Sequence, residues 1–155
     1  MRHLYRLVSI FITINYLALT TPVEAGDAKS ADLVRGGEPC NMCDLRYEDF
    51  SSLSLDNISL RGAYLFNAKF ERASLIGANL ESASIVLGNL KRVDLSKAML
   101  AKANLQKASM FGATLRGANL RFARLVDANL EASELTGADL TSSNLSGVNL
   151  TDAFA

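Results

Sequence analysis

The sequence predicts an all-β solenoid, in which the chain winds into a stack of four-sided coils. The main observation is a five-residue period that runs without a break from Leu45 to Leu150, with an aliphatic or aromatic residue at every fifth position. Two residues before most of these lies Ala or Gly, and Asp or Asn often directly precedes them. An internal repeat of this kind decides the architecture, so it is interpreted before any local element.

The period of five fits neither a continuous helix nor a continuous strand. On an α-helix five residues advance about 500°, so the apolar residues would spiral around the axis. On a strand an odd period would place successive apolar residues on opposite faces. The chain must therefore turn within each repeat, and four short extended pieces turned by about 90° close one coil. Successive coils are expected to stack like parallel strands at about 4.8 Å.

The other recurring residues suit the corners of such a coil. The repeated Asp and Asn side chains can bond nearby backbone at turns. Gly recurs two residues after the apolar position, as at Gly62, where it supplies the positive φ that a type II turn needs. Because side chains twenty residues apart form one column, we expect Phe50 to stack on Phe70 and Leu75 to share a column with Leu95.

This repeat resembles the pentapeptide-repeat family, whose signature is A(D/N)LXX. The motif stands intact at residues 78–80, 103–105, 118–120, 128–130 and 138–140. The resemblance covers nearly all of residues 43–155 and implies a right-handed quadrilateral β-helix. The resemblance does not imply one function, but most members look like binding or structural proteins, and none of the repeat positions is catalytic. We therefore expect no enzymatic activity, no cofactor, and no catalytic or metal-binding residue.

Residues 1–25 are predicted to be a signal peptide. Arg2, His3 and Arg6 give a positive start, and residues 7–19 are apolar but short for a transmembrane helix. Small residues before Gly26 suit cleavage, so the mature chain is expected to be exported to the periplasm or secreted. The alternative is an uncleaved anchor. After cleavage the chain contains no histidine.

Residues 26–42 are predicted to form an N-terminal cap with a short helix. Ser30 is the expected N-cap, Asp32 suits the first turn, and Gly36 ends the helix. Leu33 and Val34 would then cover the first coil, whose backbone edge would otherwise stay unpaired. Residues 43–155 form the β-helix. Its first repeat is expected to be irregular, because Glu48 stands where Ala is usual.

Cys40 and Cys43 lie between the cap and the first coil. A structural disulfide is favoured because it fits an exported protein, and a similar Cys pair opens the coil in many exported proteins of the family. A redox dithiol would need a βαβ setting that is absent here. A zinc site is disfavoured because it needs about four ligands, and residues 26–155 contain no further Cys and no His. Two free, packed thiols remain a further alternative.

Apolar side chains at outward positions predict a contact surface on one face of the rod, because lined-up exposed apolar groups favour binding over chance exposure. The alternative is an apolar face without a partner. The expected partner is another protein. The residues of this apolar face are Tyr64, Phe66, Val86, Leu87 and Val126, with Phe122 at the neighbouring corner.

Charge is segregated along the rod. Residues 61–125 hold 11 basic and 3 acidic residues, net +8, whereas residues 26–60 are net −4 and residues 126–155 net −5. A basic waist could bind an acidic partner or an anionic envelope or membrane surface, or remain a solvated surface. Nucleic acid is not expected, because aromatic residues are absent from the cluster and the chain is predicted to be exported. The waist consists of Lys91, Arg92, Lys97, Lys102 and Lys107.

Two further hypotheses concern partners. DNA mimicry, as in pentapeptide-repeat proteins that bind topoisomerase, would need a long acidic rod, and the basic middle of this chain argues against it. The last repeats lack a second capping helix, so either Phe154 folds over the last coil or two chains meet tail to tail as a homodimer. The five acidic residues of the segment 126–155 oppose that contact.

Overall fold

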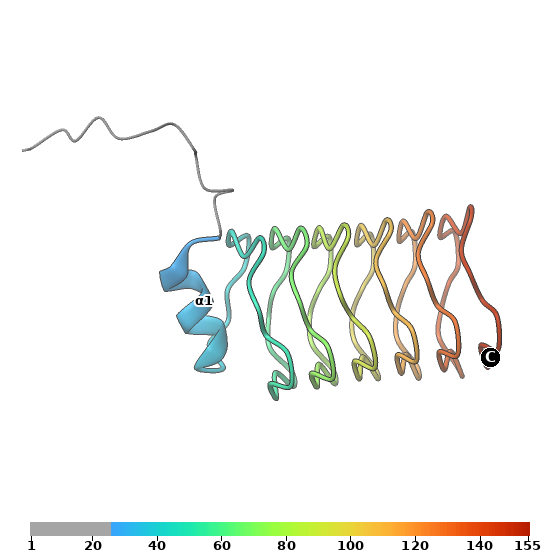
Figure 1. Ribbon diagram of the computed structural model, residues 1–155, viewed down its shortest axis with the longest axis horizontal. Coiled ribbons are helices and arrows are strands. Elements are labelled where there is room, and N and C mark those ends of the chain that lie inside the picture. The colour runs from blue at the N-terminus through green and yellow to red at the C-terminus, as the bar shows by residue number, and fades with distance from the viewer. Residues whose placement is uncertain (1–25) are drawn as a thin grey trace, which may run out of the picture.

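The computed structural model describes residues 26–155, which form a rod of stacked coils with one helix at its N-terminal end (Figure 1). The predicted signal peptide lies outside the described residues. The helix, α1, spans Ala28–Arg35. Within residues 26–155 the coils contain isolated parallel bridges instead of longer strands, because a turn follows each bridged residue. We therefore number positions around the coil by residue.

Each coil contains twenty residues, as the sequence predicted. Parallel bridges join residues twenty apart, from Asp44 with Tyr64 to Glu134 with Phe154. The backbone bonds follow the same register, because the Leu75 amide donates to the Asp94 carbonyl at 2.8 Å. Leu75 and Leu95 accordingly lie in one column, and the expected stacking of coils is confirmed.

The corners adopt the predicted type II geometry at every repeat. From Met42 to Asp152 each fifth residue has a φ between 55° and 71°. The residue after each positive-φ residue donates a backbone hydrogen bond to the apolar residue that begins the turn, as the Ala63 amide does to the Leu60 carbonyl at 3.1 Å. The glycines in this position meet the expectation, but most corners place a residue with a side chain in the left-handed region.

Asp and Asn side chains bond to the backbone of the corner that follows them, which confirms their predicted role. The side-chain oxygen of Asn79, for example, accepts from the Glu81 amide at 3.0 Å. The same bond to the amide two residues ahead recurs along the rod. Its acceptors are Asp44, Asp49, Asn79, Asn89, Asp94, Asn104, Asn119, Asn129, Asp139, Asn144 and Asn149.

The core is the interior of the rod, where the columns of Leu and Ala are buried. The rings of Phe50 and Phe70 stack with centroids 5.2 Å apart, as expected from their shared column. Ser133 is the polar exception among the described residues, since it is completely buried and its hydroxyl has no hydrogen-bond partner.

The cap helix begins earlier than the sequence predicted. Its N-cap is Asp27, whose carboxylate accepts from the Lys29 amide at 3.1 Å and from the Ser30 hydroxyl at 2.9 Å. The assignment of Ser30 as N-cap was therefore wrong, because the preceding aspartate offers a better acceptor for the first turn. Asp32 consequently lies beyond the first turn, whereas the helix ends at Gly36 as expected.

The face of α1 that covers the first coil also differs in part. Ala31 and Val34 are buried, but Leu33 is exposed. Residues three apart share a helix face and adjacent residues do not. Because Val34 faces the coil, Ala31 also faces it and Leu33 faces solvent. The prediction that Leu33 covers the coil was wrong.

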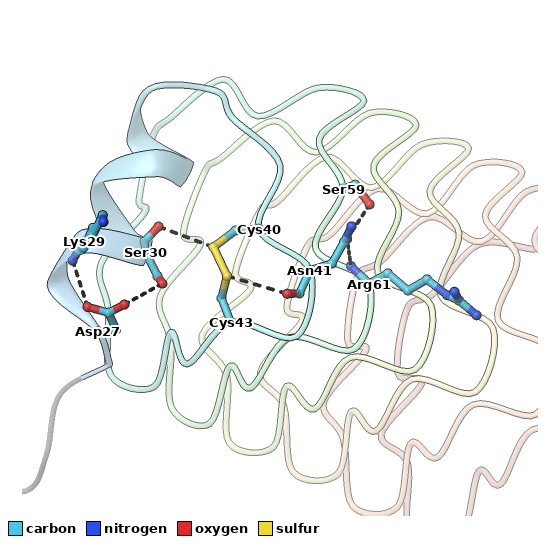
Figure 2. Close-up of a disulfide and its surroundings, with 8 residues drawn as sticks. All are labelled: Asp27, Lys29, Ser30, Cys40, Asn41, Cys43, Ser59 and Arg61. Atoms are coloured by element: carbon cyan, nitrogen blue, oxygen red, sulfur yellow. Dashed lines mark hydrogen bonds between the residues drawn. A yellow bond between two sulfur atoms is a disulfide. The ribbon is translucent and has the colours of Figure 1, made fainter.

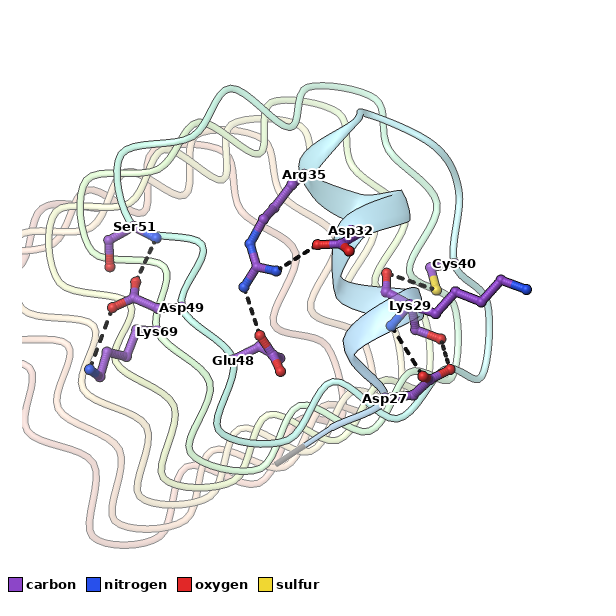
Figure 3. Close-up of polar contacts among 10 residues, drawn as sticks. Asp27, Lys29, Asp32, Arg35, Cys40, Glu48, Asp49, Ser51 and Lys69 are labelled. Carbon is purple, nitrogen blue, oxygen red and sulfur yellow. Dashed lines mark hydrogen bonds and ion pairs between the residues drawn. The ribbon is translucent and has the colours of Figure 1, made fainter. Parts of the chain in front are cut away.

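Glu48 is irregular for a reason that lies in the cap. Its carboxylate accepts from the Arg35 guanidinium at 2.7 Å (Figure 3). The same guanidinium lies 5.5 Å from the centre of the Phe50 ring. The bond to Glu48 holds the pKa of Arg35 above its ordinary value. This acidic residue therefore connects the first coil to α1.

Phe154 does not fold over the last coil. It is exposed and bridges to Glu134, and its amide donates to the Ser133 carbonyl at 2.9 Å. This pairing fixes its side chain at an outward position, so Leu145 and Leu150 stay partly exposed below it.

Candidate interaction surfaces

The four corners of the rod are the units of its surface. Residues twenty apart occupy the same corner, and each corner contributes two outward residues per coil. Corner A contains residues 41–42 and those at each further twenty, corner B starts at 46–47, corner C at 51–52 and corner D at 56–57.

The structure places the residues of the predicted apolar face on or between corners A and B. Tyr64 lies on the side that joins them, Leu87 at corner B and Phe122 at corner A, and these side chains are 51%, 44% and 53% exposed. Phe66 and Val86 are half-buried at corner B, as is Val126.

Tyr47, which the sequence analysis did not assign to this face, extends it at corner B. Its ring packs edge-on against Phe66 with centroids 5.4 Å apart. The twenty-residue period could have revealed it, because Tyr47 occupies the same column as Leu87. Gln106 and Lys107 interrupt the apolar residues in the middle of the corner.

The basic waist surrounds the rod and does not form one patch. Arg92 lies at corner C, Lys97 at corner D, Lys102 at corner A and Lys107 at corner B, because a step of five residues moves the chain to the next corner. Only Lys91 and Arg92 share a corner in one coil. A flat anionic surface can therefore meet only part of the waist.

The waist cations nevertheless lack the ion pairs that several other cations of the rod form. Within residues 26–155 none of the five forms an ion pair, and none is buried. Several cations elsewhere on the rod are paired, as Arg61 is with Glu81 at 3.4 Å and Arg121 with Asp139 at 3.2 Å. The middle of the rod thus presents uncompensated positive charge.

A shallow groove of about 410 Å³ opens at corner C. It is lined by Glu71, Lys91, Arg92, Phe111 and Asn129. The sequence analysis did not single out Phe111, although it follows Lys91 by one coil in the same column. Two further grooves, of about 330 and 350 Å³, flank the exposed side chain of Met42 at corner A.

A disulfide crosslinks the segment that leads from α1 into the first coil. Cys40 and Cys43 are joined by a disulfide, with their Cα atoms 5.6 Å apart (Figure 2). Between them, the Asn41 side-chain oxygen accepts from the Ser59 hydroxyl at 2.7 Å and from the Arg61 amide at 3.1 Å. The segment after α1 is therefore fastened to the coil that follows it.

Two negative findings apply to residues 26–155. No three or more His, Cys, Asp or Glu side chains gather there in a way that could hold a metal ion. The single helix of this part of the chain is too short and too polar to cross a membrane.

Known structures give several similarities. A cyanobacterial pentapeptide repeat protein, Rfr23 from Cyanothece 51142, is 28% identical over 82% of this chain and 95% of its own, with a TM-score of 0.45. A pentapeptide repeat protein from the Arabidopsis thaliana thylakoid lumen is 26% identical over 79% and 71%, with a TM-score of 0.48. QnrB1, a plasmid-mediated fluoroquinolone resistance protein, is 18% identical over 76% and 67%, also with a TM-score of 0.48.

The chain matches a protein family but no individual curated protein. The comparison with curated proteins gives no match. The family model for pentapeptide repeats, in contrast, matches in 8 copies over residues 43–81, 88–117 and 115–152. These segments contain most of the coils described above. The chain therefore belongs to the pentapeptide-repeat family.

Proposed function

We propose that this protein is an exported, non-enzymatic scaffold that binds another protein through the apolar face between corners A and B. The observation that carries the proposal is that the exposed side chains of Tyr64, Leu87 and Phe122 all lie on or between corners A and B. Ile76 and Met99, which are also exposed, lie apart on other sides. Grouped exposed apolar residues are typical of protein contact sites.

The scaffold supports such binding because its surface is already ordered. Backbone bonds between coils hold every side of the rod, as from the Leu65 amide to the Ser84 carbonyl at 2.7 Å. A partner would therefore lose little free energy in ordering this face. Aromatic side chains such as Tyr64 and Phe66 also give large contact areas with few rotatable bonds.

Several residues that could perform acid–base chemistry have structural tasks. Residues 26–155 contain no histidine, and several of their aspartates accept backbone bonds at the corners, as Asp94 does from the Ser96 amide at 2.9 Å. General catalysis needs a base directed at a substrate. The distribution of carboxylates thus supports a binding function.

Two features support export. The first 25 residues have the composition of a signal peptide. The Cys40–Cys43 disulfide suits an oxidising compartment, because cytosolic reductants keep most thiols reduced. An export assay that detects the N-terminus of the processed chain tests this part of the proposal.

A second candidate function is binding to an acidic partner or an anionic envelope surface. It is favoured by the absence of ion pairs at the basic waist in the described part of the chain. Lys102 and Lys107 flank the apolar face at corners A and B, so both candidates could use the same side of the rod. A partner for this side would combine apolar and acidic groups.

Cross-linking in the native compartment followed by affinity capture tests the main proposal. Phe66→Asp and Leu87→Asp should each abolish capture of the partner, whereas Ile76→Asp at corner D should preserve it. Unchanged circular dichroism and thermal midpoints establish that the variants fold. Capture by Phe66→Asp at the level of the unmodified protein would contradict the proposal.

The second candidate has its own readout. Replacing the five waist cations with Ala should abolish cosedimentation with vesicles of anionic phospholipid if the waist binds such surfaces, and Phe66→Asp should leave it unchanged. Absence of vesicle binding by the unmodified protein at low salt would exclude a membrane surface as the ligand.

A further inference from the structure

We propose that corner C is a self-complementary surface through which two copies of this chain pair antiparallel, related by a two-fold axis that passes between their Phe111 side chains. The inference concerns a different surface from the apolar face and does not depend on the proposed function. It rests on the order of charges that the twenty-residue coil places along this corner.

Corner C is basic in its N-terminal half and acidic in its C-terminal half. Two columns run along it. The first contains Ser51, Glu71, Lys91, Phe111, Glu131 and Thr151, and the second contains Ser52, Arg72, Arg92, Gly112, Ala132 and Asp152. Phe111 and Gly112 therefore separate three cations from two anions, with one further anion, Glu71, on the basic side.

A two-fold axis perpendicular to the rod reverses the order of coils but keeps each column on its own side. A residue one coil before Phe111 then meets the residue one coil after it on the other copy. Lys91 faces Glu131 of the partner subunit, and Arg72 faces Asp152 of the partner subunit. Each contact occurs twice, so the surface pairs cations with anions along its length.

The charged groups on this corner are available for such contacts. Within residues 26–155, Arg72, Lys91, Glu131 and Asp152 form no ion pair. Glu131 uses one carboxylate oxygen to accept from the Asn149 amide nitrogen at 3.1 Å, which leaves its other oxygen for a cation. The three others are exposed, and Glu131 is half-buried.

The centre of the corner suits the axis. Phe111 is half-buried in the groove of about 410 Å³, beside the Lys91 and Arg92 side chains, and two such rings could pack against each other across the axis. Gly112 follows it without a side chain, and the stem of Arg92 from the preceding coil lies beside its backbone.

The other corners lack this order. Counted over both columns of corner A, B or D, any single axis pairs opposite charges at no more than one kind of contact in residues 41–147, whereas the axis at corner C gives two kinds. At corner A, for example, the axis that brings Glu81 to Arg121 also brings Lys102 to its own copy. Charge complementarity therefore selects corner C.

Exposed ion pairs are individually weak and screened by salt, so we expect a reversible dimer. Sedimentation velocity of the purified full-length protein, from about 10 µM to about 1 mM at low salt, should show it. Lys91→Glu should weaken dimerisation about 10-fold, because two attractive contacts become repulsive. Glu131→Lys should have the same effect, and the double variant Lys91→Glu/Glu131→Lys should restore dimerisation.

The chain offers matched controls. Lys102→Glu changes the net charge equally but lies at corner A, so its dimerisation should be unchanged. Glu is compatible with the position of Lys91, because Glu71, Glu81 and Glu131 occupy the same place in other repeats. Loss of dimer in Lys91→Glu therefore reports the interface and not the fold, which circular dichroism verifies.

Cross-linking locates the axis. Phe111→Cys should form a covalent dimer with a short bismaleimide, whereas Gln106→Cys, at the equivalent place on corner B, should not. A monomer at every concentration would overturn the proposal. So would a dimer that is insensitive to Lys91→Glu, a double variant that does not restore it, or equal cross-linking of the two cysteine variants.

Discussion

The two ends of the rod consist of the same repeat but differ in how well their interiors are covered. In the first coil Leu45 and Phe50 are completely buried beneath α1. In the last coil Leu145 and Leu150 occupy the same two columns and are 37% and 43% exposed. The repeat alone therefore does not bury the interior of the terminal coil, because each coil covers only its neighbours.

The covered end uses contacts that the repeat does not contain. Ala31 and Val34 cover the coil with apolar side chains, and Arg35 pairs with Glu48. The Cys40–Cys43 disulfide closes the short loop between α1 and the first coil. The first coil also gains backbone partners, since the Gly26 amide donates to the Arg46 carbonyl at 2.8 Å. Stability at this end should thus depend on the cap, and the following predictions test that dependence.

The largest difference is expected for the same substitution at both ends of one column. Leu45→Ala should lower the free energy of unfolding by about 2–5 kcal/mol, because it leaves a cavity in a closed interior. Leu145→Ala should cost less than half of that, since its side chain is already partly in water. Urea denaturation measures both. Equal losses would show that the cap does not set the difference.

Removal of the disulfide should affect the covered end next. Cys40→Ala/Cys43→Ala should lower the free energy of unfolding by about 2 kcal/mol, as expected for a crosslink that closes a very short loop. Limited proteolysis should then cut near α1 before it cuts the coils. Cleavage that begins in the last coils, with the α1 region intact, would contradict this role.

The Arg35–Glu48 contact should be revealed by a mutant pair. Arg35→Ala alone should cost about 1–2 kcal/mol, because the Glu48 carboxylate, 13% exposed, loses its partner. Arg35→Ala/Glu48→Ala should recover most of the loss, since Ala68 occupies the same column one coil later. Chemical denaturation of the single and double variants gives the coupling. Additive losses would mean that the pair contributes nothing specific.

Ser133→Ala should stabilise the less covered half of the rod by about 1 kcal/mol. The buried hydroxyl of Ser133 lacks a partner, and Ala113 and Ala153 flank it in its column. Thermal unfolding should shift upward. Ala113→Ser, which introduces the same hydroxyl one coil earlier, is the matched control and should destabilise.

The smallest effect concerns acid. The Arg46 side chain lowers the pKa of Asp44, and the Ser51 side chain lowers that of Asp49, to which Lys69 also donates (Figure 3). This stabilisation is complete above the ordinary aspartate pKa of about 3.9 and is lost as pH falls through the lowered values. Asp44→Asn/Asp49→Asn keeps the turn acceptors but should reduce the fall in the denaturation midpoint between pH 6 and pH 3.

Most of the fold could be predicted from the sequence because the interior obeys one period. The columns, the Phe50–Phe70 stack and the Asx bonds all follow from residues spaced by five and twenty. The cap could not be predicted as well, since a choice between Asp27 and Ser30 as N-cap depends on local geometry. The Arg35–Glu48 pair joins residues thirteen apart and has no periodic signal.

The surface was less predictable than the core, because its residues must also be assigned to a corner. The residues of the apolar face lie on or between two adjacent corners, because they belong to neighbouring columns. Lys97 and Lys107 were grouped by proximity in sequence, yet they occupy different corners. Sorting residues by columns before grouping them by charge also shows the charge order along corner C.

The left-handed backbone at every corner gives this rod a rule for surface change. From residue 42 to residue 152, the second corner position contains no Val, Ile or Thr, whereas the first contains Ile76, Val86 and Thr136. A branched β-carbon clashes with a positive φ, so selection or design can place such residues on only one flank of a corner. Any new recognition site on this scaffold is therefore restricted to unbranched or small residues at the second position of each corner.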